Sequence, residues 1–398
     1  MTGNVLMGQS GGPTSVINAS LAGLITEAKK KKYMKKIYGM HYAIEGFLQD
    51  QVVDLGAQSD EVIAGLRTTP SSGLGSCRYK LLDKDLPLVL EKLKKYDIRY
   101  LFLIGGNDSM DTVHRIEAYC QKNDYELIGV GVPKTVDNDL FGTDHTPGFG
   151  SAGRYVALSV KESGLLARDM QKVDKFVVHQ CVGRDAGWLA ASSALAKEKP
   201  SDAPHIILTP ENDFDDKTFI AEVERVEKAY GYVYIVCGEG VHYKDGSPVS
   251  ASKTRDKFSN VEFGAMGGSS VALELHKMIT NKFGWRGEFQ ITESLPMCGE
   301  DRASKVDKEE AFKCGQEAVK LADKGVTGVM VSMVREKGDK YKIAYKTAPL
   351  SSVAIAAKPM PASMFTKNKM FVTKKYLDYA SPIIGELPKF VTLDFKKK

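Results

Sequence analysis

Short apolar runs alternate with longer stretches of helical periodicity over most of this chain. Residues 5–7 form the first apolar run, and Ile17, Leu21, Leu24 and Ala28 then recur at the spacing of one helical face. This order indicates parallel βαβ units, because two parallel strands need a crossover between them. Further strands are predicted at residues 100–104, 127–132, 176–181, 205–208, 232–236 and 329–334, with helices from 109 and at 190–197, 219–230, 271–279 and 308–323.

Length and composition exclude several classes of protein. The 398 residues allow two or three domains at about 150 residues each. Hydrophobic residues make up 43% of the chain and charged residues 26%, which is typical of a globular protein and unlike a disordered or collagen-like one. The net charge of +5 is too mild to indicate a nucleic-acid-binding protein and equally suits a pocket for anionic metabolites.

The cysteine pattern and the start of the chain predict a cytoplasmic location. The six cysteines form no C-x-x-C pair and are typical of a reducing compartment; they are Cys77, Cys120, Cys181, Cys237, Cys298 and Cys314. No apolar run approaches the roughly 18 residues of a membrane span. The first residues pass into a strand-like segment without a charged leader, so no membrane partner is expected.

A glycine-rich turn follows the first apolar run. It reads Gly-Gln-Ser-Gly-Gly-Pro-Thr over residues 8–14. Gly11 and Gly12 would let backbone N–H groups converge on an anion, and the next helix would present its positive dipole end to the same place. The alternative is a tight turn with an ordinary Ser or Thr cap. The Walker pattern is excluded, since no Gly-Lys-Ser/Thr follows.

A second glycine-rich turn follows the strand predicted at residues 100–104. Gly105 and Gly106 allow close approach of a ligand, and Asn107 and Asp108 offer oxygens for a hard cation such as Mg²⁺. The alternative is that Asp108 or Ser109 only caps a helix.

The third turn, after Pro133, concentrates the most chemistry. Lys134 and Thr135 could hold a transferring phosphoryl group, while Asp137 accepts a proton from an attacking hydroxyl beside Asp139. A calcium loop is a competing interpretation, but the glycine and terminal glutamate that it needs are missing. A structural turn rich in Asp and Asn stays open. Ligands of open α/β sheets bind at the carboxyl ends of strands, so all three turns are predicted to face one cleft.

These turns resemble those of the phosphofructokinase family, and in particular its pyrophosphate-dependent branch. The matches run in the family's order from Gly11 to about Asp307. ATP-dependent members read Gly-Gly-Asp-Gly-Ser in the second turn and Pro-Gly-Thr-Ile-Asp-Asn-Asp in the third. This chain has Asp108 and Lys134 where those members have glycines. Asp108 would oppose the α-phosphate of a nucleotide, and Lys134 would supply a cation to pyrophosphate.

The resemblance implies a role for each residue of these loops. Asp137 would be the base that deprotonates the sugar 1-hydroxyl, with Asp139 as its companion and Thr135 as a ligand of the transferred group. Arg78 would bridge the donor and acceptor phosphates. Pyrophosphate would be bound by Gly11, Gly12, Gly106, Asp108 and Lys134, and Mg²⁺ by Asn107 and Asp108, although the family usually has an Asp at position 107.

The sugar-phosphate side matches the family less evenly. Besides Thr135 and Asp137, the resemblance implies that the sugar is held by Val182, Gly183, Arg184 and Glu239. A surface arginine and a capping glutamate are the plain alternatives. Lys175 falls where an arginine often reaches into the neighbouring subunit's 6-phosphate pocket. Met297 falls where the 6-phosphate arginine is expected, so Arg286 or Arg302 would supply that charge.

The resemblance implies the phosphofructokinase fold of two interleaved, three-layer, Rossmann-like α/β domains. Residues 1–141 with about 260–310 would bind the donor, and residues 142–259 with part of 311–350 the sugar phosphate. Residues 351–398 would be a C-terminal extension with a solvated end.

The implied reaction is reversible, Mg²⁺-dependent transfer of a phosphoryl group from pyrophosphate to the 1-hydroxyl of fructose 6-phosphate, a step of glycolysis and gluconeogenesis. A homodimer or homotetramer is expected. The alternatives are an ATP-dependent phosphofructokinase, a sedoheptulose 7-phosphate kinase and a regulatory subunit that binds sugar phosphate without catalysis. The last would be expected to lose Asp137, Asp139 or Thr135, and all three are present.

Overall fold

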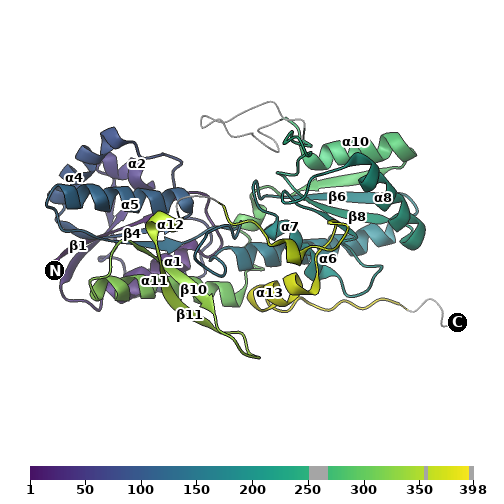
Figure 1. The fold of residues 1–398 in the computed structure, drawn as a ribbon. Coiled ribbons are helices and arrows are strands. Elements are labelled where there is room, and N and C mark those ends of the chain that lie inside the picture. Colours follow the sequence, from purple (N-terminus) through teal and green to yellow (C-terminus); the bar gives the residue numbers. More distant parts are fainter. Residues whose placement is uncertain (251–267, 354–356, 394–398) are drawn as a thin grey trace.

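Two α/β units make up the molecule, each built around its own sheet (Figure 1). The structure is a computed structural model that describes residues 1–250, 268–353 and 357–393. Among these residues, no helix is long and apolar enough to cross a membrane.

The first unit contains a seven-stranded sheet in the order β11-β10-β5-β4-β1-β2-β3. Its inner strands are parallel, while β3 and β11 pair antiparallel at the two edges. The strands are β1 (Gly3–Gln9), β2 (Met34–Met40), β3 (Val52–Asp54), β4 (Ile98–Gly105), β5 (Ile128–Pro133), β10 (Val329–Arg335) and β11 (Ile343–Pro349).

Helices cover both faces of this sheet, which makes three layers. Side-chain alternation along β1 sends Val5 and Met7 into the core under α1 and α11, and Leu6 into the core on the opposite face. Gly23 and Gly315 let α1 and α11 pack closely, since a Cβ at either position would collide with the backbone of the other helix. The first face carries α1 (Ile17–Ala28), α3 (Asp60–Leu66) and α11 (Lys305–Asp323); the other carries α2 (Ala43–Leu48), α4 (Leu86–Lys95), α5 (Asn107–Lys122) and α12 (Leu350–Val353).

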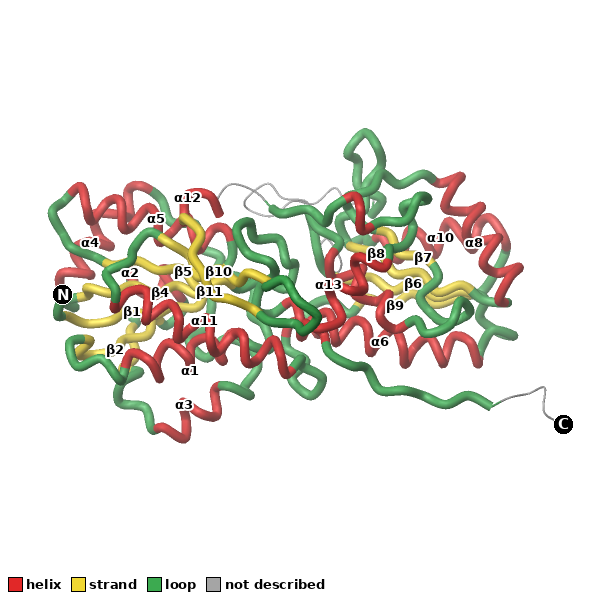
Figure 2. Tube along the Cα trace, turned by 60° about the horizontal axis from the view of Figure 1, so that its bottom comes forward, coloured by secondary structure: helices red, strands yellow, loops and turns green. Residues whose placement is uncertain are grey.

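The second unit contains a four-stranded parallel sheet in the order β7-β8-β6-β9 (Figure 2). Its strands are β6 (Phe176–Cys181), β7 (Ile206–Leu208), β8 (Val233–Gly238) and β9 (Gly287–Ile291). One face packs against α6 (Phe149–Asp169), α7 (Trp188–Ser192) and α13 (Lys374–Ile384), and the other against α8 (Asp216–Tyr230) and α10 (Val271–Phe283). Short 3₁₀ turns lie at Asp83–Asp85, Ser193–Ala196, Leu295–Met297 and Ala362–Met364. The predicted α/β class with two three-layer units is confirmed.

The strand pairing reverses the predicted assignment of the later segments. Residues 260–310 were expected in the first unit, but β9 pairs with β6 of the second sheet. Part of 311–350 was expected in the second unit, but β10 and β11 complete the first sheet. A partly exposed edge strand such as β9 lacks the continuous apolar run that marks a buried strand. The expected boundary at 259–260 lies outside the described residues.

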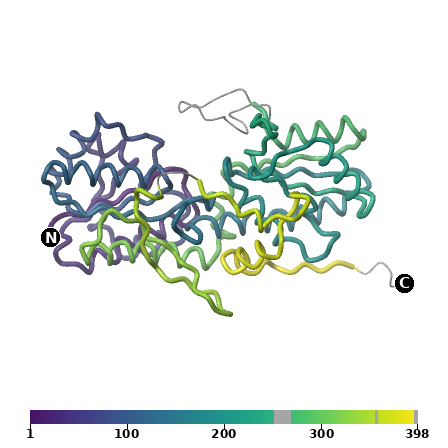
Figure 3. The backbone as a smooth tube through the Cα atoms, in the orientation of Figure 1, coloured from purple at the N-terminus to yellow at the C-terminus, as the bar shows by residue number. Residues whose placement is uncertain are grey.

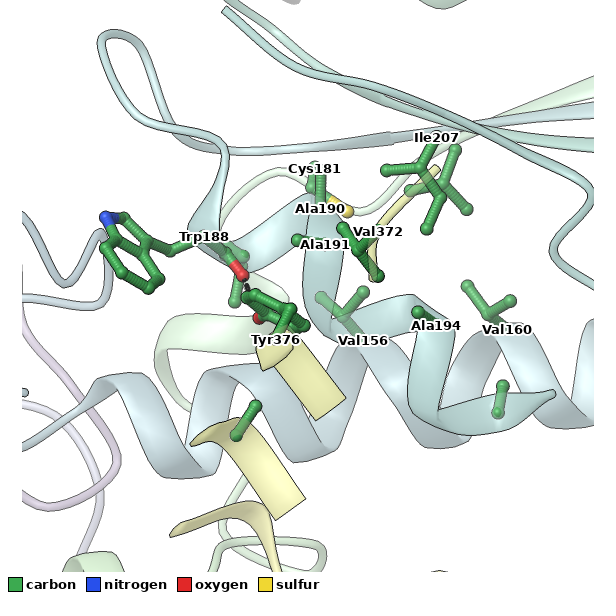
Figure 4. Close-up of a cluster of buried hydrophobic side chains, with 14 of the residues drawn as sticks. Val156, Val160, Cys181, Trp188, Ala190, Ala191, Ala194, Ile207, Val372 and Tyr376 are labelled. Atoms are coloured by element: carbon green, nitrogen blue, oxygen red, sulfur yellow. Dashed lines mark hydrogen bonds between the residues drawn. The ribbon is translucent and has the colours of Figure 1, made fainter. Parts of the chain in front are cut away.

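The segment beyond residue 351 differs from the expected solvated extension. It crosses from the first unit to the second, where α13 packs beside α6 and α7 (Figure 3). Tyr376 is fully buried, and its hydroxyl donates to the Trp188 carbonyl at 2.5 Å (Figure 4). Ala380, Ile383 and Ile384 are also buried, so α13 presents an apolar face at helical spacing that the sequence analysis missed. The exposed end begins after this helix.

Candidate active site

The carboxyl ends of strands from both sheets meet at one place. The Ser10 N–H donates to the Ile104 carbonyl at 2.9 Å, and the Lys134 N–H donates to the Gly105 carbonyl at 3.0 Å, so the three predicted turns lie side by side. From the second sheet, Gly183 approaches so closely that a Cβ there would lie 3.9 Å from Asp137 Oδ1. The structure therefore brings both units to the third turn.

Lys134 reaches from the third turn into the first. Its Nζ donates to the Gly12 carbonyl at 2.5 Å. Gly11 adopts a left-handed conformation with a φ of +75°, and a Cβ there would lie 3.3 Å from the same Nζ. Burial lowers the pKa of Lys134 to about 8, against the opposing charges of Asp137 and Asp139. A cation is thus fixed beneath the backbone of the first glycine-rich turn.

The second turn leads directly into α5. Gly105 is required there, because a Cβ would collide with the Ser109 side chain. The N-cap position is occupied by Gly106, and no side chain caps the helix. The alternative in which Asp108 or Ser109 serves only as a cap is therefore not seen. The second turn runs into the amino end of α5, and the first turn ends shortly before the amino end of α1. The amino end of a helix favours a bound anion.

Asn107 and Asp108 could contribute to a metal site in this second turn. The side-chain oxygen Oδ1 of Asn107 is buried and has no hydrogen-bond partner, and Asp108 is exposed beside it. The described residues contain no cluster of three or more His, Cys, Asp or Glu side chains able to hold a metal. Mg²⁺ commonly keeps several waters and binds through one or two protein oxygens plus substrate phosphates. These two residues fit that mode of binding.

The third turn is held rigidly by its own side chains. Asn138 adopts a left-handed conformation with a φ of 57°. Its Nδ2 donates to the Tyr379 hydroxyl at 2.7 Å, and its Oδ1 accepts from the Thr146 N–H at 3.1 Å. The Asp137 N–H donates to Thr135 Oγ1 at 3.1 Å. The two carboxylates on either side of Asn138 are thereby fixed by the loop between them.

Burial and neighbouring acids tune both carboxylates of this turn. Burial, followed by the charges of Asp139 and Glu239, raises the pKa of Asp137 to about 7, and Lys134 opposes that rise. Burial also raises the pKa of Asp139, against hydrogen bonds from its backbone and from Thr135. A carboxylate with a pKa near neutrality is suited to act as a general base.

The second sheet supplies Gly183 and Glu239 to the site. Gly183 has a φ of +127°, and a Cβ there would lie 2.8 Å from the Ala186 carbonyl, so only glycine fits. Its N–H donates to Glu239 Oε1 at 3.3 Å, and the Glu239 N–H donates to the Cys181 carbonyl at 3.0 Å. Burial raises the pKa of Glu239, against the hydrogen bond from Gly183 and the charge of Arg184.

Two further predicted residues flank these groups. Val182 packs against the core formed by α6, α7 and α13. Arg78 is exposed, and its charge reaches Lys134 strongly enough to help lower the pKa of that lysine. The position of Arg78 is therefore compatible with a contact to a ligand in the first turn.

Three of the predicted cations form ion pairs with acids of the same chain. Lys175 precedes β6 at its amino end, where its Nζ lies 3.0 Å from Glu227. Arg286 precedes β9 at the same end of the sheet and pairs with Asp174 at 2.9 Å. Arg302 follows β9, pairs with Glu162 at 3.4 Å and lies over the Tyr155 ring. Lys175 and Arg286 therefore lie at the end of the second sheet opposite the end that carries Gly183 and Glu239.

Sequence reasoning missed several groups around the candidate catalytic loop, residues 134–148 between β5 and α6. Lys358 and Tyr379 reach it from the C-terminal segment, and Asp185 influences the pKa of both Asp137 and Asp139. Met297, expected near the sugar phosphate, lies against the first glycine-rich turn, since a Cβ at Gly12 would be 2.8 Å from Met297 Cε. Asp185 adjoins the Val-Gly-Arg motif and could have been found there. The other contacts are long-range and leave no local sequence signal.

Comparison with known proteins assigns the chain to a family. The family described as Phosphofructokinase matches residues 4–322. The chain therefore belongs to the phosphofructokinase family, which confirms the resemblance seen in its motifs. It is 37% identical over 388 residues to a pyrophosphate–fructose 6-phosphate 1-phosphotransferase of Halomonas elongata, covering 96% of this chain and 91% of that protein.

Two other relatives bear on function. A crystal structure of a pyrophosphate-dependent phosphofructokinase from Marinobacter aquaeolei matches with a TM-score of 0.88 at 33% identity, covering 99% of this chain and 94% of that chain. A sulfofructose kinase of Alkalicoccus urumqiensis is 31% identical over 384 residues, covering 96% of each protein.

Proposed function

We propose that the protein transfers a phosphoryl group reversibly from pyrophosphate to the 1-hydroxyl of fructose 6-phosphate, giving fructose 1,6-bisphosphate and phosphate. The observation that carries this proposal is the pairing of Lys134 with the Gly11–Gly12 turn, next to the buried Asp137. A fixed cation beneath an anion-binding turn suits a small, highly charged donor. Asp108 at the entrance to α5 adds a negative charge that disfavours a nucleotide.

The geometry supports a direct in-line transfer. Asp137 takes the proton from the sugar 1-hydroxyl as that oxygen bonds to the transferred phosphorus, and the bond from phosphorus to the leaving phosphate breaks. Lys134 and Arg78 stabilise negative charge on the phosphoryl oxygens. Thr135 accepts a hydrogen bond from the Asp137 N–H, and its hydroxyl donates to Asp139. We propose that this hydroxyl turns from Asp139 to a phosphoryl oxygen when the donor binds.

We propose Mg²⁺ as the metal, bound by the pyrophosphate and water together with one or two protein oxygens. When bound, it would neutralise charge on the donor oxygens. Asn107 would present its unpartnered Oδ1, and Asp108 its exposed carboxylate. Their place at the start of α5 puts both residues beside the turn that receives the donor.

The acceptor sugar would lie between the two units. Gly183 and Glu239 border Asp137 from the second sheet, with Arg184 beside them. Lys175 and Arg286 lie at the far end of their strands, so we propose that they serve a neighbouring subunit of a homodimer or homotetramer. We propose Arg302 as the residue of the same chain that binds the 6-phosphate of the sugar.

The donor is tested by assaying purified protein with Mg²⁺ and fructose 6-phosphate, using either pyrophosphate or ATP, in both directions of the reaction. We expect turnover with pyrophosphate and a rate lower by about 100-fold or more with ATP, because the carboxylate of Asp108 would repel the phosphates of ATP. Strong turnover with ATP alone would contradict the donor assignment.

The acceptor is tested separately with a panel of sugars at fixed pyrophosphate. The 31% identity to a sulfofructose kinase makes sulfofructose a second candidate acceptor, and sedoheptulose 7-phosphate belongs in the same panel. We expect the highest kcat/KM with fructose 6-phosphate. A higher kcat/KM with either of the others would reassign the acceptor and leave the donor chemistry unchanged.

A further inference from the structure

A short stretch of the C-terminal segment links the catalytic loop to the second unit. The Lys358 N–H donates to the Asp139 carbonyl at 2.6 Å, and the Lys358 carbonyl accepts from Trp188 Nε1 at 3.2 Å. Two residues on, the Met360 N–H donates to Glu211 Oε1 at 3.1 Å, and the same oxygen accepts from the Gly187 N–H at 2.8 Å. The stretch is therefore linked to the loop that contains Asp137 and Asp139 and, through Glu211, to the loop from Gly183 to Gly187.

The Lys358 side chain turns back toward the catalytic loop. Its Nζ donates to the carbonyl of Thr143 at 3.1 Å and to that of Asp144 at 2.9 Å. It also lies 5.4 Å from the centre of the Trp188 ring. Two carbonyl acceptors and an aromatic face hold the ammonium at one position.

The charge of Lys358 interacts with two carboxylates, those of Asp139 and Asp144. Burial lowers the pKa of Lys358 to about 8, and the charges of Asp144 and Asp139 oppose that change. In return, Lys358 is one of the groups that lower the pKa of Asp139. Other charged groups also face these two carboxylates. Asp137, Lys134 and Asp185 interact with Asp139, and His145 and Arg335 both contact Asp144.

We infer that Lys358 is a positioning residue for phosphoryl transfer, which holds the Asp137–Asp139 loop through its backbone N–H and through the hydrogen bonds of its ammonium group to the Thr143 and Asp144 carbonyls, and which places a positive charge near Asp139. The inference rests on the proposed function, because it assigns Lys358 to the loop that carries the base. Lys358 does not touch the reacting atoms in this arrangement. It acts through Asp139 and the loop.

The test compares four proteins: wild type, Lys358→Met, Lys358→Arg and a control, Lys374→Met. Lys374 is an exposed lysine in the same segment and pairs with Asp378, one turn further along its own helix. We expect Lys358→Met to lower kcat by about 10- to 100-fold while each KM changes by less than about threefold, because the loop shifts without losing its substrate contacts. Lys358→Arg should recover most of this loss, and Lys374→Met should match wild type.

The pH profile separates positioning from a purely structural role. Asp137 and Asp139 interact closely enough to titrate as a pair, and the acid limb of kcat/KM reports the last proton that the pair releases. Without the ammonium group the pair holds this proton more tightly, so the acid limb should move to higher pH in Lys358→Met and return in Lys358→Arg. Thermal unfolding followed by circular dichroism shows whether each variant is folded. If Lys358→Met does not fold, Lys358→Gln takes its place, since an amide still donates to the two carbonyls but carries no charge.

The outcomes distinguish the two levels of the argument. If wild-type protein has no activity with pyrophosphate, the proposed function fails. If wild type is active and a folded Lys358→Met or Lys358→Gln keeps a kcat within about twofold of wild type and an unmoved acid limb, the role of Lys358 is overturned while the proposed function stands.

Discussion

A carboxylate that takes a proton from a sugar hydroxyl works best when its pKa lies near the pH of the reaction. Asp137 meets this condition because it is buried beside Asp139 and Glu239. Lys134 counters the rise and keeps enough of the ionised form available. The acid–base balance of the site thus depends on Lys134 and on several acids that come from both units.

Replacing Asp137 with Asn tests the base directly. The amide has nearly the same shape but cannot accept the proton, so kcat should fall by about 10²- to 10⁴-fold, with little change in KM for pyrophosphate. Steady-state kinetics measure both constants. Asp213→Asn, at an exposed position of the second unit, is the matched control. A near-normal kcat in Asp137→Asn would remove this residue from the role of base.

The pKa values also predict the shape of the pH profile. Asp137 must be deprotonated to act, so kcat/KM should fall as the pH drops below its pKa of about 7. Lys134 and Lys358 must be protonated, so kcat/KM should also fall as the pH rises above about 8. The expected profile is a narrow bell between these values. A profile that stays flat down to about pH 5 would show instead that the base has the ordinary pKa of an aspartate.

At the scale of elements, one side chain joins two helices that belong to different units. Asp307, in the first turn of α11, accepts from the Gly148 N–H at 2.9 Å and from the Ser151 N–H at 2.8 Å. It thereby caps the amino end of α6, where no local residue does so. Asp307 is fully buried, so its loss would leave two backbone donors without partners.

Substitution of Asp307 by Ala should lower the free energy of unfolding by about 2 to 4 kcal/mol, from the lost cap and the unpaired donors. Chemical denaturation measures this quantity. Asp339→Ala, an exposed position between β10 and β11, should change it by less than about 0.5 kcal/mol. Equal stability of the two variants would show that the cap of α6 contributes little.

Prediction from sequence succeeded for the parts that are continuous in the chain. Each of the three turns follows a buried strand, and its residues are neighbours in sequence, so composition and order sufficed. Strand β2 and the edge strands β3, β9 and β11 escaped prediction because exposed residues interrupt their apolar pattern. Lys358 and Tyr379 escaped for another reason. They lie over 200 residues from the loop that they contact, and no local pattern records such a contact.

At the scale of the whole molecule, the position of two cations predicts association of chains. Lys175 and Arg286 lie at the end of the second sheet opposite Asp137. Light scattering after size-exclusion chromatography should therefore give the mass of two or four chains. Arg286→Ala should raise KM for the sugar phosphate by about tenfold or more and leave that for pyrophosphate unchanged. A monomer with full activity would contradict this expectation.

The order of strands in the first sheet also governs how the chain is made. The edge of β5 is closed by β10, and the whole of the second sheet is encoded between these two strands. During synthesis on the ribosome, β5 therefore has an unpaired edge until the second unit has been synthesised and β10 emerges. Translation that stops before β10 would release a chain whose exposed strand can pair with another copy, so aggregation of truncated products follows from the interleaving itself.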